Sequence, residues 1–180
     1  MAEYTKDLIG GQIMNSIFER ISVRKYEDKQ VEPEKIEKIL RAGMQAPTSG
    51  NQQPWEYYVV TNPEVKLALS QTHKYSGFVK DAPLCIVPCY RTDETKLVHA
   101  EDTQIDLANS TETMLLEITE LGLGATWIGI CPGPDRMAHV KKVLNMPDDL
   151  EPFCLMPVGY PAESRPQQNR YDEKRVHYAK

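Results

Sequence analysis

The chain has 180 residues, with 26 acidic and 21 basic side chains and a formal net charge of −5. A chain of this length buries roughly 70% of its unfolded surface, so it needs no disulfide or structural metal to hold a core. Its mildly acidic balance gives no basic face for nucleic acid. No uncharged apolar run reaches the roughly 18 residues of a membrane-spanning helix. The first residues do not form a signal peptide, so we expect a cytoplasmic protein.

Cysteine and histidine positions give no sign of a metal site. Cys85, Cys89, Cys131 and Cys154 lie in or at the end of apolar runs, and no pair has the C-x-x-C spacing. We expect four small buried side chains in a reducing compartment. The histidines, His73 among them, are scattered, and we expect them in solvent or at the edge of the core.

The first third of the chain predicts two helices, a loop and a strand. Residues 16–21 read as a short helix, and a second helix begins at Pro33, a residue favoured in the first turn. Pro47 ends that helix and opens a polar loop at 47–54, rich in turn-forming residues. A β-type run follows at 55–60.

The rest of the chain alternates helices and strands, which indicates a layered α+β or α/β protein. In order, we expect a helix near 64–71, a strand at 84–90, the longest helix at 102–121, a strand at 125–130, a helix at 135–144 and a strand at 153–160. The longest helix has an apolar stripe that predicts its buried face, made by Ile105, Ala108, Leu115, Ile118 and Leu121.

Residues 161–180 form a polar tail with almost no apolar periodicity. Taken alone, such a tail is typical of a disordered segment. The alternative is an arm that lies on a partner subunit.

The sequence lacks the common signatures of phosphate loops, zinc proteases and serine hydrolases. The nearest approach to a dinucleotide fingerprint begins at Gly122, but its third glycine has the wrong spacing, and it runs from a helix into a strand. A Rossmann site is therefore not expected.

Three polar clusters remain as candidate binding residues. In Arg20-Ile21-Ser22-Val23-Arg24 an extended chain would project two guanidinium groups and a hydroxyl to one side, which suits an anion; a solvated basic turn is the alternative. The second cluster, residues 46–55, concentrates hydroxyl and amide groups that could read a heterocycle, unless it is a plain connecting loop. The third contains Gly129, whose place inside a strand indicates a bulge or the close approach of another group, against ordinary packing.

Taken in this order, the three clusters resemble the FMN-dependent nitroreductase family. The resemblance runs from about Met14 to Tyr178. It rests on RISVR near the N-terminus, the loop APTSGNQQPW, the turn GLGATWIG, and a last strand VGYPAE followed by a basic tail that ends in VHY. Each motif alone is weak, but four motifs in this order and spacing make a strong signal.

The resemblance implies an α+β three-layer sandwich, with a mixed, mainly antiparallel central sheet flanked by helices, in an intertwined homodimer. The nitroreductase-like domain would cover residues 14–160. An N-terminal arm would occupy 1–13, and a C-terminal arm at 161–180 would pack on the partner subunit. Two FMN molecules would each lie in a cleft formed by both subunits.

The resemblance also assigns residues to the anionic end of FMN. Arg20, Ser22 and Arg24 would hold the phosphate and ribityl chain or the pyrimidine edge, and Arg170 would complete the phosphate site. Family tails often carry a lysine two residues before this arginine, and here Gln168 stands in its place. The phosphate site would therefore rest more heavily on Arg20 and Arg170.

Other residues would contact the flavin ring. Ile128 and Gly129 match the segment that lies against the ring, where a backbone N–H approaches N5. The partner subunit would supply residues of the polar loop, namely Thr48, Ser49, Asn51 and Gln53. Thr113 stands where many members have asparagine.

The implied activity is hydride transfer from NADH or NADPH through flavin N5 to a nitroaromatic, quinone or similar electron-poor acceptor, by a ping-pong mechanism. No catalytic acid or base is required, in agreement with the lack of a convincing dyad. The protein would supply position and electrostatics, and Arg24 is our hypothesis for the charge that stabilises the N1–C2=O edge. The expected partners are a second copy of the chain and a small-molecule acceptor, with no nucleic acid and no membrane.

Two other interpretations keep the flavin. One is a flavin-dependent dehydrogenase of a cyclic or peptide metabolite, which a screen of acceptors would separate. The other is a non-enzymatic flavin-binding protein, which would not bleach with NADH.

Overall fold

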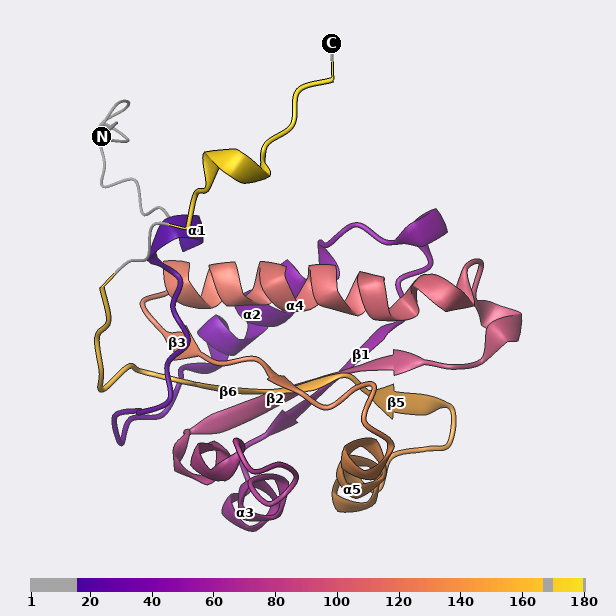
Figure 1. The fold of residues 1–180 in the computed structure, drawn as a ribbon. Helices are drawn as coiled ribbons and strands as arrows, with labels where there is room; N and C mark the ends of the chain where they lie inside the picture. The colour runs from indigo at the N-terminus through magenta and orange to yellow at the C-terminus, as the bar shows by residue number, and fades with distance from the viewer. Residues whose placement is uncertain (1–15, 167–169, 180) are drawn as a thin grey trace.

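A central sheet separates two groups of helices in the computed structural model, which describes residues 16–166 and 170–179 (Figure 1). The expected N-terminal arm, 1–13, and Gln168 lie outside the described residues. The strands pair in the order β1-β2-β6-β3, with β4 also on β6 and β5 also on β2, and all these pairs are antiparallel. The strands are β1 (Trp55–Val60), β2 (Leu84–Arg91), β3 (Gly124–Ala125), β4 (Ile128–Gly129), β5 (Leu150–Pro152) and β6 (Cys154–Gly159).

Helices cover both faces of this sheet, which confirms the expected α+β layers. One face carries the short α1, α2 and the long α4, and α3 and α5 lie on the other (Figure 1). Their bounds are Ser16–Glu19 for α1, Pro33–Met44 for α2, Pro63–Leu69 for α3, Thr103–Glu120 for α4 and Pro134–Leu144 for α5. A parallel bridge between Ser22 and Ala125 adds a parallel pairing to the antiparallel sheet.

The alternation of side chains along β2 builds two cores. Successive residues of a strand point to opposite faces. Cys85 and Val87 pack with Leu69 of α3 and Val140 of α5. Ile86 belongs to the opposite cluster, whose buried helical members are Ile39 from α2 and Met114, Leu115 and Ile118 from α4. Because β2 is buried on both sides, it reads as a continuous apolar run.

Local sequence signals explain where α3 begins and where α5 ends. The Asn62 side chain accepts hydrogen bonds from the backbone N–H groups of Glu64 (2.8 Å) and Val65 (3.2 Å), and Pro63 takes the first helical position of α3. The helix α5 ends at Leu144 and is followed by Asn145, whose φ of 48° is left-handed.

Three expectations about secondary structure are wrong in detail. The strand at 125–130 is two short strands, β3 and β4, and between them the hydroxyl of Thr126 donates to the carbonyl oxygen of Val23. A further strand, β5, precedes the last one and was not foreseen. Ile105 in α4 is 60% exposed, whereas Leu115 and Ile118 of the same apolar stripe are buried, so the stripe marks the buried face only in part. Thr103, Asp106, Ser110 and Thr111 are buried polar residues of this helix.

The tail begins as part of the body and then leaves it. Ala162 N–H donates to the carbonyl oxygen of Lys25 (3.0 Å), and Tyr26 and Pro161 form an antiparallel bridge. Residues 170–179 project away from the sheet and helices (Figure 1).

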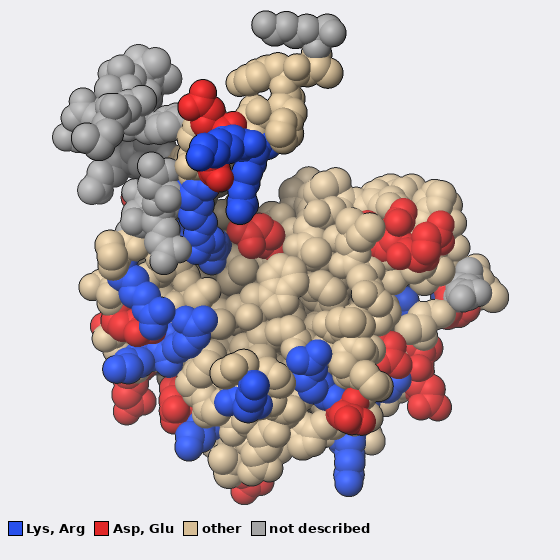
Figure 2. Space-filling view, in the orientation of Figure 1, with Lys and Arg blue, Asp and Glu red and all other residues tan. Residues whose placement is uncertain are grey.

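Charged residues of both signs are interspersed on the face shown in Figure 2, and the area over the middle of α4 carries few of them. Within the part of the chain that the structure describes, no helix has the length and apolar character needed to cross a membrane.

A substitution at Gly124 tests the close packing between Val23 and β3. A Cβ built on Gly124 would lie 2.5 Å from Cγ2 of the buried Val23. We expect Gly124→Ala to lower the free energy of unfolding by about 1–3 kcal/mol, the usual cost of overpacking. Chemical denaturation measures this cost. Gly77→Ala is the control, because a Cβ there has nothing within 4 Å, and it should change stability by no more than about 0.5 kcal/mol. Equal effects of the two variants would contradict the close packing.

Candidate functional site

A cavity of about 700 Å³ lies between two segments that are distant in sequence. One wall is the stretch 73–78 after α3, where His73, Lys74, Tyr75, Gly77 and Phe78 line the space. The other wall is formed by residues 126–129 and Cys131, and Arg24 and Arg136 complete the lining. The volume falls in the range of roughly 300–1,000 Å³ that is typical of small-molecule sites.

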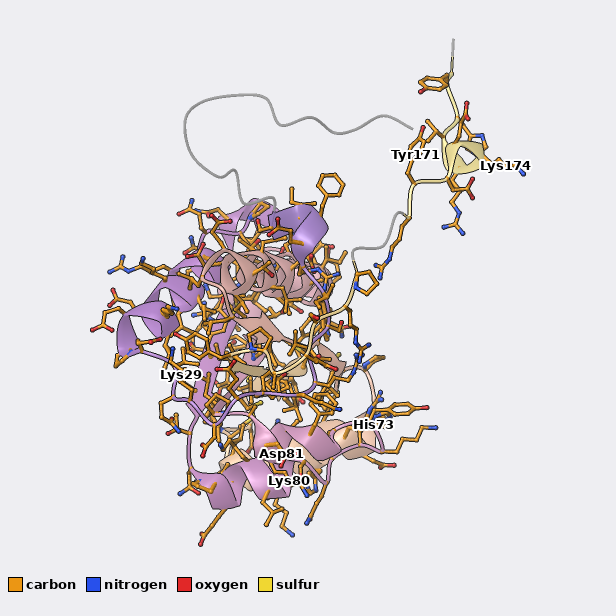
Figure 3. The ribbon with its side chains drawn as sticks, turned by 90° about the vertical axis from the view of Figure 1, so that its left-hand side faces the viewer. Lys29, His73, Lys80, Asp81, Tyr171 and Lys174 are labelled. Atoms are coloured by element: carbon orange, nitrogen blue, oxygen red, sulfur yellow. The ribbon has the colours of Figure 1, made fainter. Side chains whose placement is uncertain are left out.

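The buried Ser76 holds the wall at 73–78 in place. Its hydroxyl lies 2.7 Å from the carbonyl oxygens of Ser70 and His73 and accepts from the N–H of His73 at 2.9 Å. His73 and Tyr75 pack with ring centroids 5.1 Å apart, and Lys74 Nζ lies 4.9 Å from the centroid of the Tyr75 ring. In Figure 3, His73 lies at the edge of the body. The wall is therefore a bonded turn that presents an aromatic ring and a cation.

The opposite wall is held by hydrogen bonds on two sides. Thr126 Oγ1 donates to the carbonyl oxygen of Val23 (2.5 Å), while β4 pairs with β6. The N–H groups of Ile130 and Cys131 both donate to the carbonyl oxygen of Phe153, at 3.2 and 3.0 Å. Within this rigid segment, Gly129 faces open space, since a Cβ there would meet nothing closer than the backbone oxygen of Cys131 at 4.0 Å.

Arg24 reaches the cavity from a backbone that the tail fixes. Its N–H donates to Glu163 Oε1 at 2.7 Å, and this hydrogen bond lowers the pKa of the Glu163 carboxyl. Arg165 lies 3.3 Å from the other oxygen of the same carboxylate. The RISVR and VGYPAE motifs are thus adjacent in space, and Glu163 positions Arg24.

The cavity carries positive charge without a matching carboxylate. Arg24, Lys74 and Arg136 line it, and none of the described residues that line it is acidic. Cys131 is partly exposed in its wall, contrary to the expectation of four buried cysteines; its Sγ lies 3.7 Å from the Tyr90 hydroxyl. No cluster of three metal-ligating side chains occurs among residues 16–166 and 170–179.

This lining fits a flat, anionic aromatic group such as FMN. The exposed Gly129 backbone leaves room for a ring to approach, aromatic side chains stand on both walls, and three cations in the lining could stabilise the negative charge that a flavin gains on reduction. The fit rests on this chain's own residues, in particular on the open space that a side chain at Gly129 would fill.

The structure brings only three of the ten predicted cofactor residues to this cavity: Arg24, Ile128 and Gly129. Arg20 instead lies 3.4 Å from Glu112 of α4, measured from Nε to the carboxylate. Ser22 forms the bridge to Ala125 nearby but does not line the space.

The remaining five lie elsewhere in this chain. Arg170 belongs to the projecting arm, whose Tyr171 and Lys174 stand clear of the body in Figure 3. The other four form the polar loop between α2 and β1, which does not line the cavity of its own chain, and they are Thr48, Ser49, Asn51 and Gln53.

That polar loop is held against the start of α4 by two carboxylates. Asp106, which is 1% exposed, accepts from the N–H of Ser49 (2.9 Å) and from Gln52 Nε2 (2.6 Å). Asp102 accepts from the Ser49 hydroxyl at 2.7 Å. Ser49 thereby uses both of its donors inside the chain. Asn51 and Gln53 have φ values of 54° and 47°, so the loop has a strained, definite shape.

Four lining residues that carry chemistry were not expected from the sequence. His73 was placed in solvent or at the core edge, and Lys74, Tyr75 and Arg136 were not singled out. The available signal for the first three was a short polar stretch between an apolar helix and a buried strand. Arg136 was visible as a cation in the first turn of a helix, where the helix dipole disfavours it.

Comparison with known proteins agrees with this geometry. The family model described as "Nitroreductase family" matches residues 17–73 and 64–160. A protein of Methanothermobacter thermautotrophicus, provisionally named NADH dehydrogenase/NAD(P)H nitroreductase, is 35% identical over 170 residues, covering 93% of this chain and 87% of that protein.

Solved structures give the same result. A Clostridium acetobutylicum protein provisionally named NADH oxidase is 42% identical, with a TM-score of 0.88, over 92% of this chain and 99% of that one. An FMN-dependent nitroreductase from Clostridium difficile R20291 is 30% identical, with a TM-score of 0.84, over 93% and 99% of the two chains. This chain belongs to the nitroreductase family.

Proposed function

We propose that this chain is an NAD(P)H-dependent oxidoreductase that uses FMN to reduce a nitroaromatic, a quinone or a similar electron-poor acceptor by a ping-pong mechanism. Membership of the family and the names of its relatives support the cofactor and the donor. The observation that carries the proposal is the cavity in which the open backbone of Gly129 faces aromatic and cationic side chains.

Bound FMN would supply the redox chemistry, taking a hydride from NAD(P)H, which leaves as NAD(P)⁺, and passing two electrons to the acceptor. The chain's own residues bind and orient. We assign Arg24, which lines the cavity, to the electron-rich pyrimidine edge that its charge would stabilise, and Glu163 keeps the backbone of Arg24 in position. Tyr75 and Trp127 narrow the space to planar molecules that stack. No side chain is assigned the role of a catalytic acid or base.

We further propose that the site is completed by a second copy of the chain. The loop with Thr48 and Asn51 does not line the cavity of its own chain, yet two buried or half-buried carboxylates hold it in a definite shape. Apolar side chains that a monomer would expose lie on α1, α4 and the arm, namely Ile17, Phe18, Ile105, Val176 and Tyr178. In this arrangement residues 14–160 form the domain, and the arm at 161–180, with Arg170, grips the partner.

The purified protein should show a flavin absorption spectrum, or acquire one on incubation with FMN. Anaerobic addition of NADH or NADPH should bleach it, because the donor stacks on the bound ring. The spectrum recorded with each donor in turn also gives the donor preference. A protein that stays colourless with FMN would overturn the proposal, and one that binds FMN without bleaching would be a flavin-binding protein and not an oxidoreductase.

Gly129→Val separates folding from cofactor binding. The valine has open space around its Cβ in the chain itself, so we expect the free energy of unfolding to change by no more than about 0.5 kcal/mol. The two methyl groups of the valine would occupy the space proposed for the flavin ring. The Kd for FMN should therefore rise about tenfold or more.

Gly129→Ala serves as the intermediate step of this series, with a smaller rise in Kd. Denaturation of the FMN-free protein and fluorescence titration with FMN measure the two quantities. Unchanged FMN affinity in the valine variant would show that the ring does not lie against this segment.

A further inference from the structure

We propose that the electron acceptor carries a negatively charged group, a carboxylate, sulfonate or phosphate, and that Arg136 at the start of α5 binds this group with help from Lys74. This inference deepens the proposed function and rests on it. It names the chemical class of the molecule that stacks in the cavity.

The cavity has more positive charges than the cofactor accounts for. Three cations line it, and the described lining residues include no acidic side chain. Arg24 is assigned to the cofactor under the proposed function, and Glu163 holds its backbone N–H. Lys74 and Arg136 have no carboxylate within 4 Å among the residues that the structure describes. Two cations are therefore left for another molecule.

The position of Arg136 also points to an anion. Arg136 is the third residue of α5, close to the positive end of the helix dipole, where a cation destabilises the helix. Its guanidinium lies against Gly133, at the place that a Cβ of that residue would take. A glycine at position 133 thus leaves room for the arginine to lie along the cavity wall. A bound anion would offset the unfavourable charge, and the guanidinium offers paired donors to a carboxylate or phosphate.

Lys74 and two aromatic side chains, Tyr75 and Trp127, also line the cavity. Lys74 lies over the ring of Tyr75 in the wall formed by residues 73–78, a turn that the buried Ser76 holds. Tyr75 and Trp127 supply flat surfaces in the lining of the same cavity. The arrangement suits a planar ring with an anionic substituent, the ring stacked and the substituent between Lys74 and Arg136.

The test compares two matched acceptors, 4-nitrobenzoate and 4-nitrobenzamide, through the ratio of their kcat/KM values. Arg136→Gln should lower the ratio of benzoate to benzamide about tenfold, the usual loss when a hydrogen bond to a charged group is removed. Arg136→Lys, which keeps the charge, should restore part of the ratio. Added salt should lower the ratio in the wild type and leave it nearly constant in Arg136→Gln.

Lys142→Gln is the matched control, because Lys142 is an exposed cation in the last turn of the same helix and does not line the cavity. It removes the same charge and should leave the ratio unchanged. An equal fall in both variants would reduce the effect to the net charge of the protein and overturn the proposal. An unchanged ratio in Arg136→Gln would overturn it as well.

Equilibrium binding gives a readout that does not need turnover. Benzoate and benzamide, which are not reduced, are titrated against the protein, with tryptophan fluorescence as the signal because Trp127 lines the cavity. Benzoate should bind about tenfold more weakly to Arg136→Gln than to the wild type. If the protein holds no flavin, the proposed function fails while this titration still tests the anion site.

The phosphates of the dinucleotide are the other source of an anion. Rapid-mixing measurement of flavin reduction by NADH and NADPH distinguishes the donor's phosphates from an anionic acceptor, because that half-reaction contains no acceptor. If Arg136→Gln weakens the binding of NADH or NADPH and leaves the acceptor ratio intact, the anion belongs to the donor and the assignment to the acceptor is wrong.

Discussion

The site depends on how the backbone between β3 and β4 is held. Val23 and Thr126 bond across one side of it, and β6 pairs with it on the other. Because this segment is tied on both sides, Gly129 can present its backbone to open space without the chain collapsing into it. The same bonds carry Arg24 to the cavity, since Arg24 follows Val23 directly.

This constraint also explains why motifs far apart in sequence act together. Three of the four motifs meet at one place, where the segment 22–26 lies between β3 and the start of the tail. A change in any of them would move the others. Glu163, which ends the tail motif, thus acts on the cavity through the N–H of Arg24, although it does not line the cavity.

Periodicity and turn chemistry predicted most of the fold, and the four motifs predicted the family. Strands buried on both faces and helices that begin at proline, such as α2, leave clear local signals. The signal failed where tertiary contacts override pattern. Ile105 lies on an apolar repeat but faces outward, while the buried residues of α4 include Asp106, which holds the polar loop. The cations Lys74 and Arg136 could not be found from spacing, because only the packing of α5 beside the turn after α3 brings them to one cavity.

The predicted site residues divide in the same way. Arg24, Ile128 and Gly129 meet because backbone pairing within one chain brings them together. Arg20, with Glu112 beside it, and the loop around Asn51 do not line that cavity in one chain. A second copy of the chain would supply the loop, and contacts between chains leave no periodic trace in a sequence.

The central claim is that one site is shared by two chains, and mixed dimers test it most directly. Arg24→Ala and Asn51→Gly chains carry different tags, and mixed dimers are purified through both; glycine keeps the positive φ of Asn51. If each FMN site takes Arg24 from one chain and Asn51 from the other, both substitutions of the mixed dimer fall in the same site. The second site then keeps both wild-type residues. The account predicts that the mixed dimer binds one FMN with wild-type affinity, while each variant homodimer binds FMN weakly at both sites. A mixed dimer with two weak sites, or a chain that forms no dimer, would contradict it.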